Sequence, residues 1–398
     1  MDVTLEPRPV KGLRFAGVTA GLRSEPGRKD LGIIVAERPI AAAGVFTTNR
    51  VKAAPVVVAH ERIRRGRLQA VAVNSGSANC FTGRAGVKLA RDSCAALASG
   101  LGCAPELVAP CSTGVIGHLY QLEKYRAGIR AALAGLSADG LGDFARAILT
   151  TDTRPKTASV RMRLGGAEVT IAGCAKGAGM IEPKMATMLA FIVTDATVRP
   201  PELRRTLADA LPSSFNAITV DGDMSTNDTL LLLASGDAGG RELRGRELSA
   251  FRSAVTAVAE ALSRELVRDG EGATKLVTVE VRGARRAADA ERIARQIANS
   301  PLVKTAFFGC DPNFGRIAMA AGKAGVALDL ERLEVGMGGI KIASHGALHT
   351  EALTAAAAAM KEREFSLMVD LRLGKASARV VTCDLSYEYV KINAEYTT

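Results

Sequence analysis

The sequence predicts a layered α/β or α+β protein with mixed β-sheets. Three observations support this prediction: apolar β-runs appear early, helical patterns and hairpins are mixed after them, and no regular β-α-β alternation connects them. The chain has 398 residues, of which 47% are hydrophobic and 23% charged, as is ordinary for a soluble globular protein. Aromatic residues make up only 4% and tryptophan is absent, so the core is expected to be aliphatic.

The first half of the chain predicts strands, then helices, then a hairpin. Alternating or continuous apolar runs predict strands at residues 32–37, 43–48, 54–60 and 68–74. Helical periodicity predicts helices at residues 84–99, 121–134 and 138–149. A β-hairpin is expected over 158–173, because two β-runs flank Gly165 and Gly166.

The second half predicts two more helices and then a second α/β region. Pro200 and Pro201 open a helix at 201–211, and Asp269-Gly270 ends one at 247–267. The later elements are expected at 275–283 (strand), 290–298 and 349–361 (helices), and 364–373 and 377–391 (strands). We therefore expect a core domain over 1–283 and a smaller C-terminal α/β region over 284–398.

Several classes of protein are disfavoured by composition. No charge-free apolar run reaches membrane-spanning length, and residues 1–15 do not resemble a secretory signal, so a cytosolic protein is expected. The seven cysteines include no C-x-x-C pair, which favours reduced, packed thiols over disulfides or a zinc site. His345 and His349 are spaced i, i+4 without a glutamate between them, so no metal site is expected.

The net charge of +11 raises the question of a nucleic-acid partner. Most arginines are interleaved with acidic residues on helical patterns, which is typical of solvated helix faces. The densest cluster has no aromatic neighbours on which bases could stack; it comprises Arg62, Arg64, Arg65 and Arg67. The sequence therefore predicts no nucleic-acid partner.

Two polar motifs resemble ligand-binding loops but lack the residues or the spacing that ligand binding requires. "KGAGM", which begins at Lys176, contains a G-x-G but not the spacing of a phosphate-binding loop. "DGDMSTND", at 221–228, supplies oxygen ligands as a calcium loop would. Thr226 replaces the required glycine, however, and Leu232 replaces the required glutamate. We therefore interpret this motif as a polar turn before a strand.

Three other motifs each have a structural interpretation that the residues alone favour. "CSTGVIG" places Thr113 before Gly114, and a hydroxyl with an adjacent N–H can bind an oxyanion, although such a motif is commonly a turn. "DGEGATK" places Glu271 between two glycines, as in a helix stop with a solvated acid. "TTDTRPK" begins with Thr150 and forms a hydroxyl cluster after a helix, where capping is the expected role.

Thr187 is the remaining candidate nucleophile. It stands between Ala186 and Met188, where the chain becomes apolar. An internal threonine is a poor nucleophile, whereas a threonine at a chain N-terminus has its own α-amine as a base. That amine has a pKa of about 7.7–8.0, which suits a general base at neutral pH. The chemistry is therefore reasonable if the chain is cut between Ala186 and Thr187.

Taken together, these motifs resemble the glutamate N-acetyltransferase family, also called the ornithine acetyltransferase family. "KGAGMIEPKMATML" is similar to the self-cleavage signature of that family. The resemblance covers nearly the whole chain, and the other matching segments follow in order, among them "AGVFTTNRVKAAPV", "CSTGVIG", "TTDTRPK", "DGDMSTNDT", "RDGEGATK", "SPLVKTAFFGCDPNFGRI" and "YVKINAEYTT". One such match would be weak, but this ordered series is highly specific.

The resemblance implies a fold, a reaction and an assembly. The implied fold is the α-β-β-α layering shared with certain self-cleaving aminopeptidases. The implied enzyme is an acyltransferase of arginine biosynthesis that moves an acetyl group from N2-acetyl-L-ornithine to L-glutamate by ping-pong kinetics. It needs no metal or cofactor, although bifunctional members also use acetyl-CoA. The two fragments are expected to stay together, as a dimer of heterodimers.

The resemblance also implies roles for particular residues. Thr187 is the nucleophile after cleavage from Ala186, and Thr113 and Gly114 form the oxyanion hole. The implied substrate-binding positions are Thr150, Lys176, Thr187, Glu271, Asn393 and Thr398. Lys176 can pair with a substrate carboxylate and Glu271 with an ammonium group. Because Thr398 is the last residue, its presence in the site implies that the C-terminus folds in and closes it.

Two alternatives remain open from the sequence. The nearer is a self-cleaving aminopeptidase of the same fold, in which water replaces glutamate. Such an enzyme would not be expected to carry the "DPNFGR" and "INAEYTT" segments. The other is a non-catalytic basic binding protein, which would remain uncleaved after purification.

Overall fold

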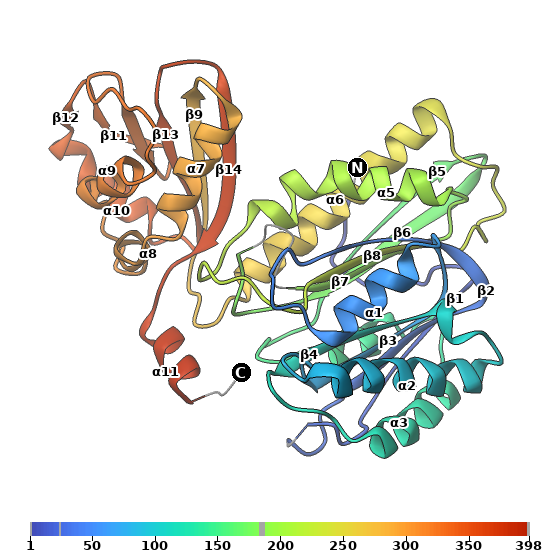
Figure 1. Ribbon diagram of the computed structural model, residues 1–398. Helices are drawn as coiled ribbons and strands as arrows, with labels where there is room; N and C mark the ends of the chain where they lie inside the picture. The colour runs from blue at the N-terminus through green and yellow to red at the C-terminus, as the bar shows by residue number, and fades with distance from the viewer. Residues whose placement is uncertain (1, 24, 183–187, 396–398) are drawn as a thin grey trace. The chain divides into compact units, whose positions relative to one another are not determined.

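The computed structural model of the protein describes residues 2–23, 25–182 and 188–395, which form two compact units. Of the described residues, unit 1 comprises the chain up to Asn216 together with Asp223–Leu266, and unit 2 comprises Ala217–Gly222 and residues 267–395 (Figure 1). This division differs from the domain boundary expected at 283/284. The reason is that strand β9 (Leu276–Ala284) pairs with two strands of the unit 2 sheet.

Unit 1 is built on one mixed eight-stranded sheet in the order β4-β3-β2-β8-β7-β6-β5, with β1 paired to β2. The strands are β1 (Leu13–Val18), β2 (Leu31–Phe46), β3 (Arg67–Ser77), β4 (Val108–Val115), β5 (Lys156–Leu164), β6 (Ala167–Lys176), β7 (Leu189–Thr194) and β8 (Thr229–Ala234). The β3–β4 and β7–β8 pairs are parallel and the other pairs antiparallel. The predicted hairpin is confirmed, because β5 and β6 pair across Gly165-Gly166.

The long strand β2 lets this sheet fold into two facing layers. Its first half pairs with β1 and β3, and after an irregularity between Val35 and Ile40 its second half pairs with β8. Phe144, on helix α4 (Leu141–Ala147), packs 5.2 Å from the ring of Phe191 on β7 and 6.5 Å from the ring of Phe15 on β1. A continuous apolar core therefore lies between the β1–β4 and β5–β8 layers.

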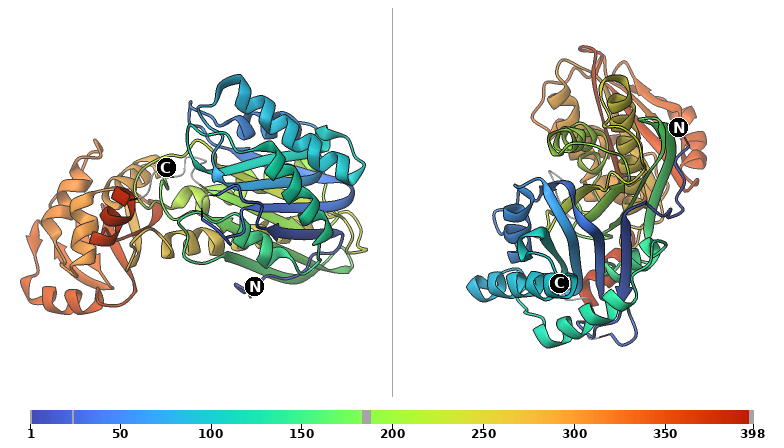
Figure 2. Two further views of the ribbon diagram at one scale, coloured as in Figure 1. Left: turned by 90° about the horizontal axis from the view of Figure 1, so that it is seen from below. Right: turned by 90° about the vertical axis from the view of Figure 1, so that its right-hand side faces the viewer.

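Helices cover the outer side of each layer. Helices α2 (Gly83–Leu101) and α3 (Leu122–Ala134) pack on β2 and β3, whereas α5 (Pro200–Ala210) and α6 (Gly245–Arg268) lie over the β6–β8 side (Figures 1 and 2). Leu262 on α6 approaches Gly173 of β6 so closely that a Cβ atom there would lie 3.1 Å from it. The expected α-β-β-α layering is confirmed.

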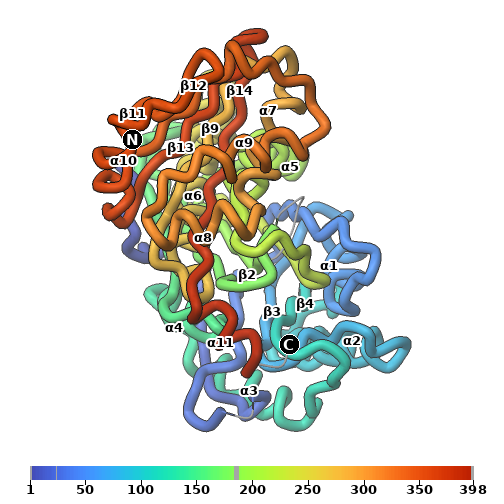
Figure 3. Tube along the Cα trace, turned by 90° about the vertical axis from the view of Figure 1, so that its left-hand side faces the viewer, coloured from blue at the N-terminus to red at the C-terminus, as the bar shows by residue number. Residues whose placement is uncertain are grey.

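Unit 2 contains a six-stranded mixed sheet in the order β12-β11-β10-β13-β9-β14 (Figure 3). Besides β9, its strands are β10 (Glu334–Met337), β11 (Ile340–Ser344), β12 (Ala347–Leu348), β13 (Glu364–Asp370) and β14 (Ala376–Cys383). Its helices are α7 (Ala287–Ala298), α8 (Pro301–Phe308), α9 (Phe314–Gly322), α10 (Leu353–Ala359) and α11 (Tyr387–Glu395). Aliphatic side chains, among them those of α7 and β9, form most of its core, as the scarcity of aromatic residues predicts, and the core also contains Phe307 and Phe365.

The strand predicted over 54–60 is wrong, because these residues form helix α1 (Ala54–Ile63). Short apolar runs do not distinguish a strand from a buried helix. Pro55 occupies the first helical turn, where proline is well tolerated. Val58 and Ala59 are buried whereas Val57 is 47% exposed, so burial follows a helical rather than an alternating pattern.

The strand predicted over 377–391 is correct only as far as Cys383. Beyond it, the Asp384 carboxylate accepts N–H bonds from Thr274 (2.8 Å) and Lys275 (2.9 Å). These contacts turn the chain away from the sheet, and helix α11 begins at Tyr387. The alternation of aromatic and β-branched residues in this stretch therefore belongs to a helix.

Candidate active site

Three of the predicted site residues come together in unit 1. The ammonium group of Lys176, at the end of β6, donates a 2.7 Å hydrogen bond to the hydroxyl of Thr150. It donates a second bond, of 3.2 Å, to the hydroxyl of Thr113 near the end of β4. Residues up to 63 positions apart in the sequence thus converge on one ammonium group. The capping role considered for the Thr150 hydroxyl is not what the structure shows.

Gly114 occupies a position that requires glycine. Its φ angle is 124°, a region that L-residues with side chains rarely adopt. An added Cβ atom would lie 2.4 Å from the carbonyl carbon of Gly76, which pairs with Gly114 across a register shift between β3 and β4. The backbone at Thr113 and Gly114 is therefore fixed by close approach of two strands.

The motif at 221–228 holds the end of β4 in place. The side-chain amide of Asn227 donates to the carbonyl of Ser112 (2.8 Å) and to that of Ala78 (2.7 Å). The Ser112 hydroxyl in turn donates to the Asn74 side chain. The motif precedes β8, as predicted. Its hydrogen bond to the segment that carries Thr113 was not predicted, because that bond joins residues 115 positions apart in the sequence.

A buried carboxylate lies beneath this cluster. Asp152 accepts from the N–H of Thr150 (3.0 Å) and from the N–H of Gly177 (2.7 Å). It also forms an ion pair with Lys156, and the side chains of both residues are 0% exposed. Burial alone would raise the pKa of Asp152, but the ammonium groups of Lys156 and Lys176 and these hydrogen bonds hold it well below its usual range. Asp152 is therefore a carboxylate at neutral pH.

The predicted cleavage residues Ala186 and Thr187, and the terminal Thr398, lie outside the described residues. Residues on either side of 183–187 make backbone hydrogen bonds to one segment of the chain. The N–H of Glu182 donates to the Asp223 carbonyl (2.8 Å), and the N–H of Thr229 donates to the Met188 carbonyl (3.0 Å). Both flanks are thus bound to the segment that includes Asn227.

The two remaining predicted residues meet in unit 2. The Asn393 side-chain amide on α11 donates to the Glu271 carboxylate at 2.8 Å. Glu271 is only 9% exposed, so it is not the solvated acid that a simple helix stop would leave. Gly272, with φ of 67°, approaches α11 so closely that a Cβ atom would lie 2.5 Å from the Tyr389 nitrogen. The Glu271 loop is therefore packed directly against the helix that carries Asn393.

Comparison with known proteins identifies the family. The ArgJ family profile matches residues 14–398. The chain belongs to the ArgJ family. It is 48% identical to the arginine biosynthesis bifunctional protein ArgJ of Geobacter sulfurreducens, over 98% of this chain and 100% of that protein. It is 46% identical to the same-named protein of Symbiobacterium thermophilum, over 97% of each chain.

A solved ArgJ structure agrees with this assignment. The crystal structure of the arginine biosynthesis bifunctional protein ArgJ from Bacillus halodurans is 39% identical to this chain. The match covers 53% of this chain and 100% of that chain, with a TM-score of 0.51. The sequence-based identification of the family is therefore confirmed.

Three buried thiols in this ArgJ family member are unsuited to act as nucleophiles. All seven cysteines are free, and five of them are buried, as predicted. Burial raises the pKa of the Cys94 thiol to about 12, and it raises the pKa values of Cys111 and Cys174 as well. These three thiols therefore stay protonated at neutral pH.

Neither a metal site nor a membrane span is found in the described part of the chain. No group of three His, Cys, Asp or Glu side chains is placed there to hold a metal ion. His345 is exposed, and His349 is half-buried and precedes a short helical turn. None of the described helices combines the length and apolar character needed to cross a bilayer.

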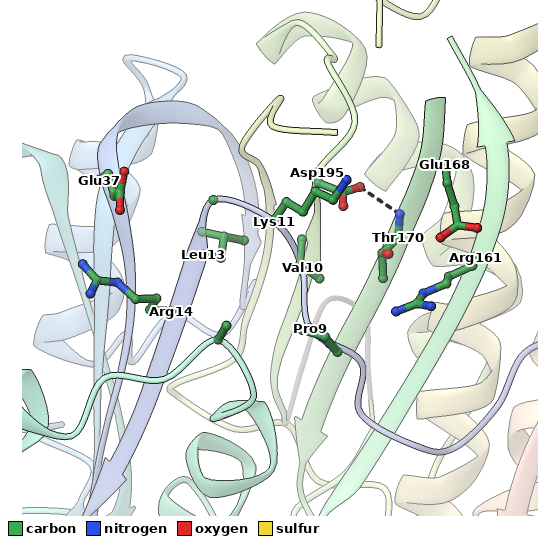
Figure 4. Close-up of a pocket in the computed structure, with 12 residues that line it drawn as sticks. Pro9, Val10, Lys11, Leu13, Arg14, Glu37, Arg161, Glu168, Thr170 and Asp195 are labelled. Atoms are coloured by element: carbon green, nitrogen blue, oxygen red, sulfur yellow. Dashed lines mark hydrogen bonds between the residues drawn. The ribbon is translucent and has the colours of Figure 1, made fainter. Parts of the chain in front are cut away.

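A separate cavity of about 300 Å³ in unit 1 is no part of the candidate site. Figure 4 shows it lined by charged side chains such as Lys11, Arg14 and Glu168, which are exposed. The carboxylate of Asp195 at the cavity already accepts a 2.8 Å hydrogen bond from the N–H of Thr170. Burial raises the pKa of Asp195, although its backbone hydrogen bonds oppose that effect. None of the predicted site residues that the structure describes lines this cavity.

Proposed function

We propose that this ArgJ family member transfers an acetyl group from N2-acetyl-L-ornithine to L-glutamate in arginine biosynthesis, acting in the cytosol. We further propose that it accepts acetyl-CoA as a second acetyl donor, in keeping with the bifunctional names of its relatives. The observation that carries the proposal is the convergence of Lys176, Thr113 and Thr150 beside the glycine-only position at Gly114. This arrangement offers hydrogen-bond donors to an oxyanion and a positive charge to a substrate.

The proposed reaction has two half-reactions. The Thr187 hydroxyl attacks the acetyl carbonyl while its own α-amine takes the hydroxyl proton. The tetrahedral oxyanion is stabilised by the Thr113 hydroxyl and the Gly114 N–H, a type of contact worth about 2.7–4 kcal/mol per donor. The C–N bond breaks, the proton passes to the departing ornithine amine, and an acetyl ester remains. The glutamate amine then attacks this ester and restores Thr187.

The energetics are consistent with catalysis that needs no cofactor. The overall exchange breaks one amide and makes a similar one, so it is close to neutral in free energy. The difficult part is the charge on each tetrahedral intermediate. Preorganised donors stabilise such charge in a site that excludes water.

Maturation is proposed to cut the chain between Ala186 and Thr187, giving fragments of 186 and 212 residues (398 − 186). The solved Bacillus halodurans chain supports this proposal, since it is fully matched by 53% of the present chain. A 212-residue fragment is likewise 53% of 398 residues (212/398). A relative present as two fragments would give such a match.

The sheet explains why the two fragments would stay associated. Strand β6 belongs to the first fragment and β7 to the second, and they pair over six residues from Ile171↔Thr194 to Lys176↔Leu189. Strand β8 of the second fragment pairs with β2 of the first. Phe191 is buried against Phe144 across the same boundary. Separation of the fragments would expose this core, so we propose that they form a stable heterodimer. We further propose that two such heterodimers assemble into a dimer of heterodimers.

Acetyl-donor assays test the proposed function. With N-acetylornithine and glutamate, ornithine and N-acetylglutamate are expected in equal amounts, with parallel double-reciprocal plots as in ping-pong kinetics. Acetyl-CoA with glutamate is expected to give N-acetylglutamate as well. Release of free acetate that glutamate does not suppress would instead indicate a hydrolase, as in the self-cleaving aminopeptidases.

Glu271 and Asn393 are proposed to bind the amino-acid substrates. Glu271→Gln keeps the shape of the side chain and removes its charge. We expect kcat/KM for N-acetylornithine to fall about ten- to a hundred-fold, because a hydrogen bond to a charged group is worth about 1.5–3 kcal/mol. The kinetics of the purified, matured variant provide the measurement.

Glu280→Gln is the matched control for this change. Glu280 also lies in unit 2, on β9, and pairs with Arg282 at the surface. Its substitution is expected to leave kcat/KM unchanged. If Glu271→Gln behaves like Glu280→Gln, Glu271 does not bind substrate.

A further inference from the structure

We infer that Lys176 promotes the reaction by polarising the Thr113 hydroxyl, and that Asp152 is the positioning residue that holds Lys176 in place. This inference rests on the proposed function and concerns the same site. It assigns Lys176 a role in stabilising the oxyanion, in addition to any contact with a substrate carboxylate. It also gives a role to Asp152, to which the sequence assigned none.

The first step is the direction of the hydrogen bonds. An ammonium group only donates, so the oxygens of Thr113 and Thr150 must both accept from Lys176. A hydroxyl that accepts such a bond still has its own hydrogen to donate. The Thr113 hydrogen is thereby directed away from Lys176 and is available to an oxyanion.

The second step is the strength of that donor. Hydrogen bonds in a chain polarise one another, and bonds from charged donors are the strong ones. The 3.2 Å bond from Lys176 withdraws electron density from the Thr113 oxygen and makes its O–H a better donor. The effect grows as charge develops on the oxyanion, so it stabilises the transition state more than the bound substrate.

The third step is the charge balance beneath the cluster. Asp152 is in direct contact with Lys156, and the Lys176 ammonium is 4.0 Å from its other oxygen. Two cations therefore lie close to one carboxylate in a site where the Lys176 side chain is only 10% exposed. The Lys176 ammonium also bonds to the Thr113 hydroxyl, so its positive charge lies close to the donor of the oxyanion and favours the anionic intermediate.

The fourth step is positioning. Asp152 accepts from the backbone N–H of Thr150 and of Gly177, the residue that follows Lys176. It thus fixes two of the three segments that meet at the ammonium group. A small displacement of a catalytic group can lower the rate about 10²-fold. Loss of Asp152 is therefore expected to lower kcat by displacing Lys176.

A double-mutant cycle tests the link between Lys176 and Thr113. Each of Lys176→Met and Thr113→Ala is expected to lower kcat about 10²- to 10³-fold, as loss of an oxyanion donor does. The double variant is expected to be no slower than the slower single variant, because both changes remove the same interaction. Rates are taken per matured fragment. If Lys176→Met instead raises KM with little change in kcat and its effect multiplies with that of Thr113→Ala, Lys176 only binds substrate.

Milder variants keep this cycle informative if a single variant fails to mature. Lys176→Arg keeps the charge, and Thr113→Ser keeps the hydroxyl. The same non-additivity is expected between them, with smaller losses of kcat. Multiplicative losses in this pair would overturn the inference in the same way.

Asp152 is tested by separating stability from rate. Asp152→Asn leaves Lys156 as a buried charge without its carboxylate, so both Tm and kcat are expected to fall. Lys156→Met is the matched control, expected to keep most of kcat because Asp152 still holds Lys176. The double variant Asp152→Asn with Lys156→Met is expected to regain Tm but not kcat. Recovery of both would mean that Asp152 is only structural.

The pH profile gives a further readout that a failure of the proposed function would not affect. The pKa of Asp152 lies well below its usual range, so Asp152 is charged throughout the assay range. The fold loss caused by Asp152→Asn, for whichever acetyl donor the enzyme uses, is therefore expected to be constant between about pH 6 and pH 9. A loss that disappears within this range would show that Asp152 titrates there and would overturn the inference.

Discussion

Replacing Thr187 with alanine is expected to abolish both maturation and acetyl transfer. Before cleavage, the hydroxyl must attack the Ala186 carbonyl in an N-to-O shift that leaves an ester, which water then opens. After cleavage, the same oxygen attacks the acetyl donor, with the new α-amine as base. Alanine has no oxygen for either step. A single full-length band on denaturing gels and the absence of ornithine formation are the expected observations.

Thr187→Ser distinguishes the contribution of the hydroxyl oxygen from that of the methyl group. Serine keeps the nucleophile but loses the β-branch, which restricts χ1 and helps to aim the hydroxyl. We expect slower maturation and weak residual transfer. The fragment released by maturation should begin at residue 187 in both wild type and this variant, which N-terminal sequencing can determine.

The covalent intermediate gives the most direct test of Thr187. Wild-type enzyme mixed with N-acetylornithine and no glutamate should carry one added acetyl group on the fragment that begins at Thr187. Mass spectrometry of the two fragments provides the measurement. An acetyl group on a cysteine or on the other fragment, or full activity of Thr187→Ala, would show that Thr187 is not the nucleophile.

The fold could be predicted where local signals agree with tertiary packing. The hairpin at β5–β6 was predicted because Gly165 and Gly166 allow the tight turn and both flanking runs have β character. Helix α1 was predicted as a strand because three consecutive valines carry the same local signal in either structure. In the structure, the buried residues of α1 follow the spacing of a helix. Which residues are buried depends on neighbours far along the chain, which the local sequence does not show.

The sequence predicted the chemically active residues of the candidate site, but not the residues that hold them in place. Thr113, Thr150 and Lys176 carry recognisable chemistry, and their motifs resemble a known family. Asp152 and Asn227 read as ordinary turn residues in the sequence. Their importance lies in burial and in bonds to segments distant in sequence, such as that from Asn227 to Ser112, and no local pattern shows such contacts.

Gly114→Ala is expected to impair both stability and catalysis. The backbone at φ of 124° is strained for alanine, at a cost of about 1–3 kcal/mol. The added methyl group would also lie 2.4 Å from the carbonyl carbon of Gly76, and backbone atoms cannot move aside as a flexible side chain can. Strands β3 and β4 must therefore separate at the register shift. That movement displaces the Gly114 N–H and the Thr113 hydroxyl together, so kcat should fall at least 10²-fold.

Gly117→Ala distinguishes this clash from backbone strain alone. Gly117 lies three residues further along the same segment with φ of 87°. Among the residues that the structure describes, no heavy atom other than those of Gly117 and its two chain neighbours lies within 4 Å of an added Cβ. Alanine there is expected to lower Tm through strain but to leave kcat unchanged, whereas Gly114→Ala lowers Tm further and kcat steeply. Thermal denaturation and steady-state kinetics on both matured variants give the comparison. Equal losses of Tm with kcat preserved in both would mean that Gly114 serves only the turn, and the oxyanion would then need a donor other than its N–H.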